Sequence, residues 1–374
     1  MKWTKIIEEG DAIDVIYTDF SKAFDSVPHC RLLKKIESLG IQGNVLNWIK
    51  GFLSDRKQQV RVDGKSSRWR EVMSGIPQGS VLGPSLFVIF INDLPDVVDS
   101  LCKLFADDVK VFQRVNIRRE NHALQNDLEG LISWSSKWQL PFNTDKCECL
   151  NIGKNNPYVK YKMGGNELKQ ARFEKDLGVI IDRDLKFREQ AATAIKKANS
   201  TLGIIKKAFA CLDEVSLPLL YKSLVRPHLE YGNVIWGPFN KEDIISVEKI
   251  QRRATKMVKS MSHLDYGERL KNLNLPSLQH RRRRGDMIFA YNIFSKKVNI
   301  KYEDLFRLSS SRTRGHQYHL IRQQATKKCR ANSFSNRIVS DWNTLPEEIV
   351  NATTTLNFKQ KLDTHWKEEI YKYI

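Results

Sequence analysis

The chain has 374 residues, of which 41% are hydrophobic, and it carries a formal net charge of +19. This length allows two or three domains with hydrophobic cores, and the composition excludes an intrinsically disordered protein. No run of about 18 or more apolar residues occurs, so no membrane span is predicted, and the polar, acidic N-terminus is unlike a secretory signal.

The positive charge is confined to one part of the chain. Residues 1–150 contain 20 basic and 20 acidic side chains, whereas residues 151–374 contain 42 basic and 23 acidic ones. The second part therefore holds the whole excess. Such a distribution is typical of a nucleic-acid partner, although general solubility or attraction to an anionic membrane would also explain it.

The six cysteines are scattered and form neither a CxxC pair nor a Cys/His zinc pattern. Ordinary packing of reduced thiols is expected, which fits an intracellular protein of the nucleus or cytoplasm.

The first hundred residues predict strands and helices in alternation. Residues 12–19 form a buried strand that ends in Asp19, and helical periodicity covers residues 32–36, capped by Gly40, and residues 45–53. The alternating stretch before Asp63-Gly64 predicts a hairpin with residues 68–73. A Gly-rich loop follows, and Pro84 suits the first turn of a helix over residues 85–94.

Residues 101–112 predict a second hairpin, with Asp107 and Asp108 at its tip. Two adjacent carboxylates repel each other, and this turn becomes sensible if a divalent cation neutralises them. Hard oxygen ligands favour Mg²⁺, with Mn²⁺ as the alternative.

The following segments complete an antiparallel α+β pattern. A helix is expected over residues 121–138, a strand over 147–152, and a single hairpin over 158–181 that turns at Gly164-Gly165. Beyond residue 185, amphipathic helices predominate.

The C-terminal helices carry basic residues beside their apolar stripes. These side chains could bind phosphates or simply form solvated polar faces. The candidate nucleic-acid contacts are Lys196, Lys197, Arg252, Arg253 and Lys256. The run Arg281–Arg284 could likewise be a nuclear-localisation or phosphate-binding patch, or one exposed helix face.

Asp19, Asp107 and Asp108 could form one site only through tertiary folding, because 88 residues separate Asp19 from Asp107. If the three carboxylates meet, they would form an open cage for two divalent ions. Two such ions stabilise the attacking and leaving oxygens of an in-line phosphoryl displacement.

Three sequence blocks make this hypothesis more specific: residues 17–25 (YTDFSKAFD), 75–84 (GIPQGSVLGP) and 105–108 (FADD). Together they resemble motifs A, B and C of the reverse transcriptases of non-LTR retrotransposons (LINEs), most closely the jockey-like branch. Residues 142–147 are similar to motif D and residues 176–179 to the motif E hairpin. Further similarity at 220–222, 231–237, 334–337 and 342–346 extends the resemblance over nearly the whole chain.

The resemblance implies a right-hand polymerase. We expect a palm with an antiparallel sheet and packed helices over residues 1–184, a helical thumb over 185–262, and a basic, mostly helical region over 263–374. The implied activity is RNA-directed DNA synthesis, in which a primer 3′-OH attacks a deoxynucleotide with the help of two Mg²⁺ ions. The implied partners are an RNA template, a DNA primer and deoxynucleoside triphosphates.

Residue roles are carried over position by position. Asp19, Asp107 and Asp108 would bind metal, with Asp108 the least certain direct ligand, and Lys146 would donate a proton to pyrophosphate. Phe24 would be the steric gate against a ribose 2′-OH. Gln78 and Gly79 would contact the incoming nucleotide or the template. Asp25 is expected to begin a helix rather than to bind metal.

The family places its fingers, and usually an endonuclease, before motif A, whereas this chain has 18 residues before Asp19. A truncated enzyme with weakened nucleotide binding is therefore expected, and the alternative is a catalytically inactive nucleic-acid-binding remnant of a mobile element. A maturase-like or telomerase-like relative is disfavoured by the blocks beyond the palm.

Overall fold

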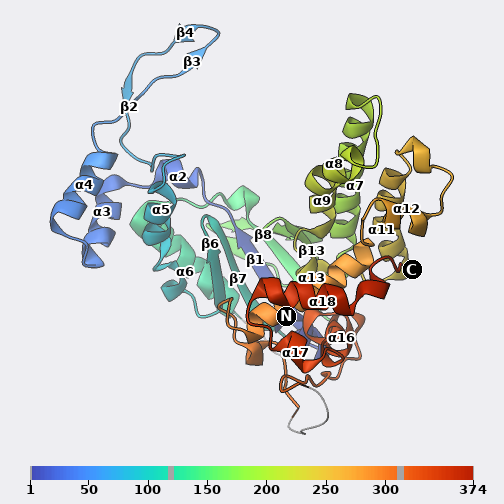
Figure 1. The fold of residues 1–374 in the computed structure, drawn as a ribbon. Helices are drawn as coiled ribbons and strands as arrows, with labels where there is room; N and C mark the ends of the chain where they lie inside the picture. Colours follow the sequence, from blue (N-terminus) through green and yellow to red (C-terminus); the bar gives the residue numbers. More distant parts are fainter. Residues whose placement is uncertain (1, 117–121, 310–315, 374) are drawn as a thin grey trace. The chain divides into compact units, whose positions relative to one another are not determined.

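The computed structural model describes residues 2–116, 122–309 and 316–373, which form two compact units (Figure 1). The first comprises Asp11–Arg172, and the second joins Met1–Gly10 to Phe173–Ile374. The predicted three-part division at residues 184 and 262 stays a prediction. In the described residues no helix is long and apolar enough to cross a membrane.

A five-stranded sheet organises the unit Asp11–Arg172, in the order β11-β8-β1-β7-β6. Its strands are β1 (Ala12–Thr18), β6 (Leu101–Phe105), β7 (Asp108–Val115), β8 (Glu148–Ile152) and β11 (Lys169–Ala171). The central strand β1 is buried except for partly exposed Tyr17, because it pairs with neighbours on both edges and carries a nearly continuous apolar run. The α+β pattern is confirmed, but the sheet is mixed, since β11 runs parallel to β8.

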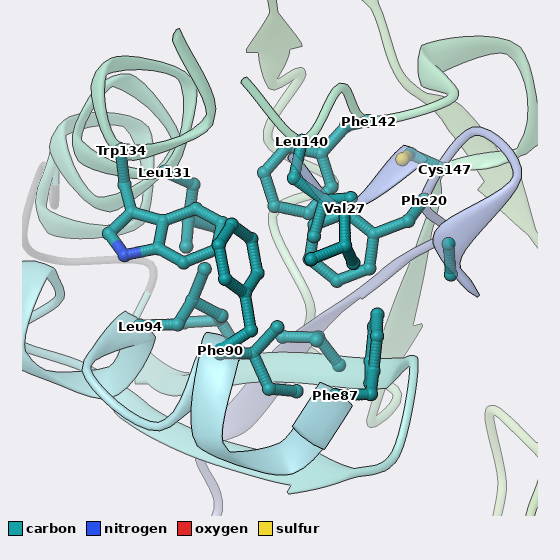
Figure 2. Packing of buried hydrophobic residues seen from close by; sticks show 14 of the residues in the cluster. Phe20, Val27, Phe87, Phe90, Leu94, Leu131, Trp134, Leu140, Phe142 and Cys147 are labelled. Carbon is teal, nitrogen blue, oxygen red and sulfur yellow. The ribbon is translucent and has the colours of Figure 1, made fainter. Parts of the chain in front are cut away.

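Helices cover one face of this sheet and enclose the largest hydrophobic core. They are α2 (Ala23–Ser26), α3 (His29–Ser38), α4 (Gly43–Leu53), α5 (Gly83–Ile91), η1 (Leu94–Val97), α6 (Ala123–Trp138) and η2 (Thr144–Lys146). Figure 2 shows aromatic rings of this core: Phe20 stacks on Phe142 with ring centroids 4.4 Å apart, and Phe90 meets Trp134 edge to face. Gly40, at φ 84°, ends α3 as predicted, because glycine adopts this conformation without a Cβ clash.

A polar network lies inside this core. The Asp14 carboxylate, fully buried in β1, accepts hydrogen bonds from Asn151 Nδ2 (2.7 Å), Asn156 Nδ2 (2.7 Å) and Tyr161 Oη (2.8 Å). Burial and the nearby Asp14 charge raise the pKa of the Tyr161 hydroxyl. A buried carboxylate is tolerated here because three donors replace the water it has lost.

The predicted hairpin turn on Asp63-Gly64 is confirmed, but Arg61–Val62 pairs with Lys65–Ser66, which precedes the predicted partner segment 68–73. Two short ladders, β2 (Lys57–Gln58) with β5 (Arg70–Glu71) and β3 (Arg61–Val62) with β4 (Lys65–Ser66), form one extended ribbon. Asp63 and Gly64 have φ values of 48° and 76°, as a two-residue type I′ turn requires.

The predicted single hairpin over residues 158–181 is wrong. The Gly164-Gly165 turn joins β9 (Lys162–Met163) to β10 (Asn166–Glu167), and the chain then adds β11 to the main sheet. A separate hairpin follows, made by β12 (Phe173–Asp176) and β13 (Val179–Asp182). Paired stretches of two residues carry too little periodicity to be distinguished in sequence.

The unit of Met1–Gly10 and Phe173–Ile374 is mostly helical. Besides β12 and β13 it contains α1 (Lys2–Glu8), α7 (Arg188–Ala208), α8 (Ser216–Leu220), η3 (Tyr221–Val225), α9 (Arg226–Glu230), α10 (Asn233–Trp236), α11 (Lys241–Thr255), η4 (Lys259–Met261), α12 (Tyr266–Asn272), α13 (Leu278–Phe294), η5 (Tyr302–Asp304), α14 (Lys328–Ala331), α15 (Phe334–Arg337), α16 (Val339–Asn343), α17 (Glu347–Val350), α18 (Thr355–His365) and η6 (Lys367–Glu369).

Two hydrophobic cores support this helical unit. One lies among α7 to α12 and includes fully buried Ala198, Val225 and Trp236, and the other gathers around Trp342 and Phe358. The N-terminal helix α1 belongs here because the Glu8 carboxylate accepts hydrogen bonds from the backbone and hydroxyl of Thr326 and from Lys327 N.

Candidate active site

Strand register brings the predicted acids to one end of the sheet. β1 and β7 are antiparallel, and their last pair is Thr18 with Val109, whose contact includes a 3.3 Å hydrogen bond from Thr18 Oγ1 to Val109 O. Asp19 follows Thr18 and Asp108 precedes Val109, so the two acids occupy the next facing positions. Asp107 is next to them in the turn. The predicted gathering of three acids that are distant in sequence is therefore present at the level of the backbone.

The hairpin tip is a two-residue turn. Phe105 pairs with Asp108, and Ala106 and Asp107 connect β6 to β7. Ala106 has a φ of 51°, a left-handed conformation that costs energy for a residue with a Cβ. Asp108 is exposed and Asp107 partly exposed, so the turn projects its carboxylates toward solvent instead of into the core.

Asp19 is held through its backbone by the segment that carries Lys146. Asn143 N donates to Asp19 O at 2.7 Å, and the adjacent residues Phe20 and Phe142 form a bridge with stacked rings (Figure 2). Lys146 Nζ then lies 3.3 Å from Asp19 Oδ2. This pair is solvent-accessible and contributes little to stability, but it places a proton-bearing cation beside the predicted metal ligand.

Asp19 has a buried neighbour, the Cys147 thiol. Burial raises its pKa to about 11, to which the Asp19 charge adds, so the thiol stays protonated at neutral pH. Cys147 donates to Asn143 O at 3.2 Å, which makes it part of the structural support for Asp19 and not a nucleophile.

Phe24 packs partly into the core. Its ring stacks on Phe87 of α5 with centroids 4.7 Å apart, and its carbonyl accepts a 2.7 Å hydrogen bond from Ile76 N. Phe24 is partly exposed, and its stack on Phe87 fixes the orientation of the ring. Its assignment as a steric gate stays a prediction.

The loop before α5 lies directly against α2. Gly75 N donates to Val27 O, and Gly75 has a φ of 94°. A Cβ at this position would lie 2.8 Å from the Asp25 carbonyl oxygen, so only glycine permits this approach. His29 Nε2 also lies 2.7 Å from Gly75 O.

Gln78 and Gly79 are exposed at the outer end of this loop. Gln78 Nε2 donates to Asp25 Oδ1 at 3.1 Å, while Gly79, at φ 80°, has no neighbour that a Cβ would meet within 4 Å. Asp25 lies in the first turn of α2, as predicted. Its second contact, which orients Gln78, was missed, because no local pattern relates residues 53 positions apart.

The described residues contain no group of three His, Cys, Asp or Glu side chains close enough to hold a metal ion. The donor chemistry at the sheet end still fits Mg²⁺, because Asp19, Asp107 and Asp108 offer hard carboxylate oxygens with access to water. The backbone thus presents a set of acids, and the side chains in this structure do not form a closed cage.

The predicted nucleic-acid contacts lie in the helical unit. Lys196 and Lys197 on α7, and Arg253 and Lys256 at the end of α11, are exposed, and Arg253 Nη1 donates to Asn199 Oδ1 across the two helices at 3.2 Å.

Arg252 differs from these residues. Its guanidinium group lies 4.8 Å from the ring centroids of both Tyr266 and Tyr373, and the side chain is partly buried. The guanidinium group packs against both tyrosine rings, and the assignment of Arg252 to nucleic-acid binding stays a prediction.

The run Arg281–Arg284 is neither an exposed helix face nor a free basic patch. Three of its four arginines pair with acids: Arg281 with Glu230, Arg283 with Asp341 and Glu369, and Arg284 with Asp363. Arg282 is buried, which lowers its pKa. The interpretation as one exposed helix face is therefore wrong, and a role in nuclear localisation or phosphate binding stays a prediction.

Comparison with known proteins gives consistent matches. Residues 8–181 match the family described as reverse transcriptase (RNA-dependent DNA polymerase). The RNA-directed DNA polymerase from mobile element jockey of Drosophila funebris is 29% identical over 267 residues, covering 67% of this chain and 29% of that protein. The probable RNA-directed DNA polymerase from transposon BS of Drosophila melanogaster is 27% identical over 288 residues, covering 73% of this chain and 32% of that protein.

These curated relatives are much longer than the chain, which spans less than a third of their length. Among solved structures, apo telomerase from Candida tropicalis aligns with a TM-score of 0.37 and 11% identity, over 73% of this chain and 48% of that one. That score is below the level that indicates a shared fold.

Proposed function

Since residues 8–181 belong to the reverse transcriptase family, we propose that the chain is the polymerase part of a non-LTR retrotransposon enzyme that copies RNA into DNA. One observation carries the proposal. The β1–β7 register aligns Asp19 with Asp108, and the adjoining turn adds Asp107, all within the matched residues. The substrates would be an RNA template, a DNA primer and deoxynucleoside triphosphates.

Asp19, Asp107 and Asp108 would hold two Mg²⁺ ions, with Mn²⁺ as a substitute. When bound, the ions would activate the primer hydroxyl and stabilise charge on the transferred phosphate. The chain itself contributes the position of these acids: the antiparallel register fixes two of them, and the hydrogen bond from Asn143 N to Asp19 O fixes the end of β1. If the three carboxylates converge on a cation, the cation would relieve their mutual repulsion.

Other side chains would select and orient the substrates. Phe24, fixed by its stack on Phe87, would exclude a ribose 2′-OH and so favour deoxynucleotides. Gln78, oriented by Asp25, would contact the nucleotide or the template together with Gly79. Lys146 would donate a proton to the departing pyrophosphate, a role supported by its ammonium group lying 3.3 Å from Asp19 Oδ2.

In this proposal the unit Asp11–Arg172 is the palm, and the helices after residue 185 act as a thumb. Lys196, Lys197, Arg253 and Lys256 would then contact the phosphate backbone of a primer–template duplex, which predicts binding that weakens steeply with salt.

Primer extension on an RNA template with Mg²⁺ tests the proposal. We expect deoxynucleotide incorporation by the wild-type chain and a loss of at least about a thousandfold in Asp107→Asn and Asp19→Asn, because each change removes charge where it is needed in the transition state. Asp96→Asn, an exposed acid in the same unit, is the matched control and should retain activity. Template binding without incorporation would instead support an inactive nucleic-acid-binding remnant, and activity that survives Asp107→Asn would refute the assigned site.

A further inference from the structure

The ribbon Lys57–Glu71 does not pack into the core of the Asp11–Arg172 unit. It extends away from helices α3, α4 and α5 (Figure 1), and every residue from Lys57 to Glu71 is exposed. Two ladders of two residues each hold it together. An isolated two-stranded hairpin is only marginally stable in water, so the ribbon contributes little to the stability of the unit.

The charge of the ribbon has no partner within the fold. Five basic side chains and two acidic ones give it a net charge of +3, whereas residues 1–150 as a whole are neutral. In the described part of the chain, none of the five basic residues forms an ion pair, although one such pair would be possible between Lys57 and Glu71, which face each other in the ladder. The basic residues are Lys57, Arg61, Lys65, Arg68 and Arg70.

Apolar side chains accompany this charge. Val60, Val62 and Trp69 are 65%, 62% and 64% exposed, respectively. No helix or sheet of the described residues packs on this two-stranded ribbon, so these side chains are exposed to water. Exposed apolar groups between polar ones are typical of interaction sites.

A β-bulge sets the position of Trp69. Gln58 pairs with Arg70, and further along Ser67 N donates to Val60 O, so Gln59 alone lies opposite both Arg68 and Trp69. A bulge of this kind bends the strand and redirects its side chains. Arg68 and Arg70 flank Trp69 in the sequence.

We propose that the ribbon Lys57–Glu71 binds a single-stranded nucleic acid, with Trp69 stacking on a base and the basic residues contacting phosphates. A duplex hides the faces of its bases, whereas a single strand offers both a base face and a flexible line of phosphates. The net positive charge of the ribbon argues against an apolar protein surface with few acidic residues as the partner. The exposed indole argues against binding by charge attraction alone. The inference rests on the proposed function for the presence of a nucleic acid, but it requires no catalysis.

Binding can therefore be measured separately from synthesis. The full chain is titrated into labelled oligo(U) and oligo(dT), each about 20 nucleotides long, and into a perfect duplex, in EDTA, with fluorescence anisotropy as the signal. Trp69→Ala should weaken single-strand binding by about tenfold, because one base stack is lost. Trp48→Ala is the matched control, since Trp48 is 62% exposed on α4 of the same unit, and should change affinity less than twofold.

Charge is tested with a triple variant, Arg61→Ala/Lys65→Ala/Arg68→Ala, against Lys34→Ala/Lys50→Ala/Lys154→Ala, which removes three exposed lysines elsewhere in the unit. The ribbon variant should reduce the slope of log affinity against log salt by about 2, because about 0.7 counterion is released per single-strand phosphate contact. The control should leave the slope unchanged. A difference between oligo(U) and oligo(dT) would identify RNA or DNA as the preferred strand.

Equal losses in Trp69→Ala and Trp48→Ala, or an unchanged salt slope in the ribbon variant, would overturn the inference. Tighter binding of the duplex that ignores Trp69 would overturn it in favour of a duplex contact. These results do not depend on primer extension: loss of synthesis in Asp107→Asn with binding intact bears only on the proposed polymerase, whereas normal synthesis with no effect of Trp69→Ala refutes only the ribbon.

Discussion

Two basic regions of the chain differ in how the fold uses their charge. In Arg281–Arg284 three arginines pair with acids of other helices and the fourth is buried. In the ribbon Lys57–Glu71 all five basic side chains are exposed and none forms an ion pair in the described residues. Charge density alone therefore does not identify a nucleic-acid surface. What distinguishes the two regions is whether the fold supplies the counter-charge.

The acids that neutralise the arginine run are distant in sequence. Arg283 donates two hydrogen bonds of 2.9 Å to Asp341 and one of 2.7 Å to Glu369, and these contacts raise its pKa. Its guanidinium also lies 4.8 Å from the Trp366 ring. The run thus ties α13 to α16 and to the C-terminal turn, and its charge belongs to the fold.

The largest effect is expected where the ion pair between Asp286 of α13 and Arg337 of α15 is broken. Arg337 binds Asp286 through two hydrogen bonds of 2.8 Å, and burial raises the pKa of the Asp286 carboxyl even with this partner present. Arg337→Met leaves a buried carboxylate without its cation, so we expect a loss of about 3–5 kcal/mol in the free energy of unfolding, measured by denaturant titration. The double variant Arg337→Met/Asp286→Asn removes both charges and should recover part of the loss. A single variant as stable as the wild type would show that this pair does not hold the helices together.

A second effect concerns pH and the first turn of α13. Burial, with help from the nearby Arg283 charge, lowers the pKa of His280 to about 4. The unfolded chain binds a proton near the ordinary pKa of about 6.5, so stability is fully present above that value and falls as pH drops toward 4. The charged groups around His280 are Arg283, Arg284, Asp363 and Glu369.

We expect His280 alone to account for about 3 kcal/mol of stability lost between about pH 7 and pH 4, the equivalent of its pKa shift. The measurement is the unfolding free energy of the wild type and of His280→Gln across this range. The carboxyl groups titrate alike in both proteins, so the difference between the two profiles reports His280. Parallel pH profiles for the two proteins would contradict the assignment.

The parts of the fold that sequence predicts depend on local rules. The strand over residues 12–19, the Gly40 helix end and the Asp63-Gly64 turn each follow from periodicity or from the φ that a residue tolerates. The three acids of the candidate site follow from a strand end and a hairpin tip, and the resemblance of the blocks that contain them makes the hypothesis more specific. The strand register brings their backbone positions to one end of the sheet.

The remainder depends on contacts that no local pattern encodes. The donors to Asp14 lie 137–147 residues away, and the acids opposite Arg281–Arg284 lie 51–86 residues away. Between residues 158 and 181, ladders of two residues leave too short a pattern to separate one hairpin from two. The roles of Lys146 and Phe24 stay predictions, although the structure shows what each side chain contacts.

A smaller effect tests whether geometry matters in the arginine run beyond charge. Arg283→Lys keeps the positive charge but loses the two-pronged contact with Asp341 and the packing on Trp366, and the side chain is about one-third exposed. We expect a loss of about 1 kcal/mol in the unfolding free energy, because lysine cannot form two parallel hydrogen bonds to one carboxylate. Arg322→Lys, at an exposed site in the same unit, is the control and should be neutral.

The most direct test of the comparison measures stability and single-strand affinity on the same proteins. Arg61→Ala/Lys65→Ala/Arg68→Ala should stay within about 0.5 kcal/mol of the wild-type unfolding free energy, as expected for exposed charges without partners, while its affinity for oligo(U) falls. Arg283→Lys should show the reverse, with reduced stability and unchanged affinity. Two results would contradict the division between charges used by the fold and charges that bind a ligand. One is a ribbon variant that loses stability but keeps its affinity. The other is an Arg283→Lys variant that loses as much affinity as the ribbon variant.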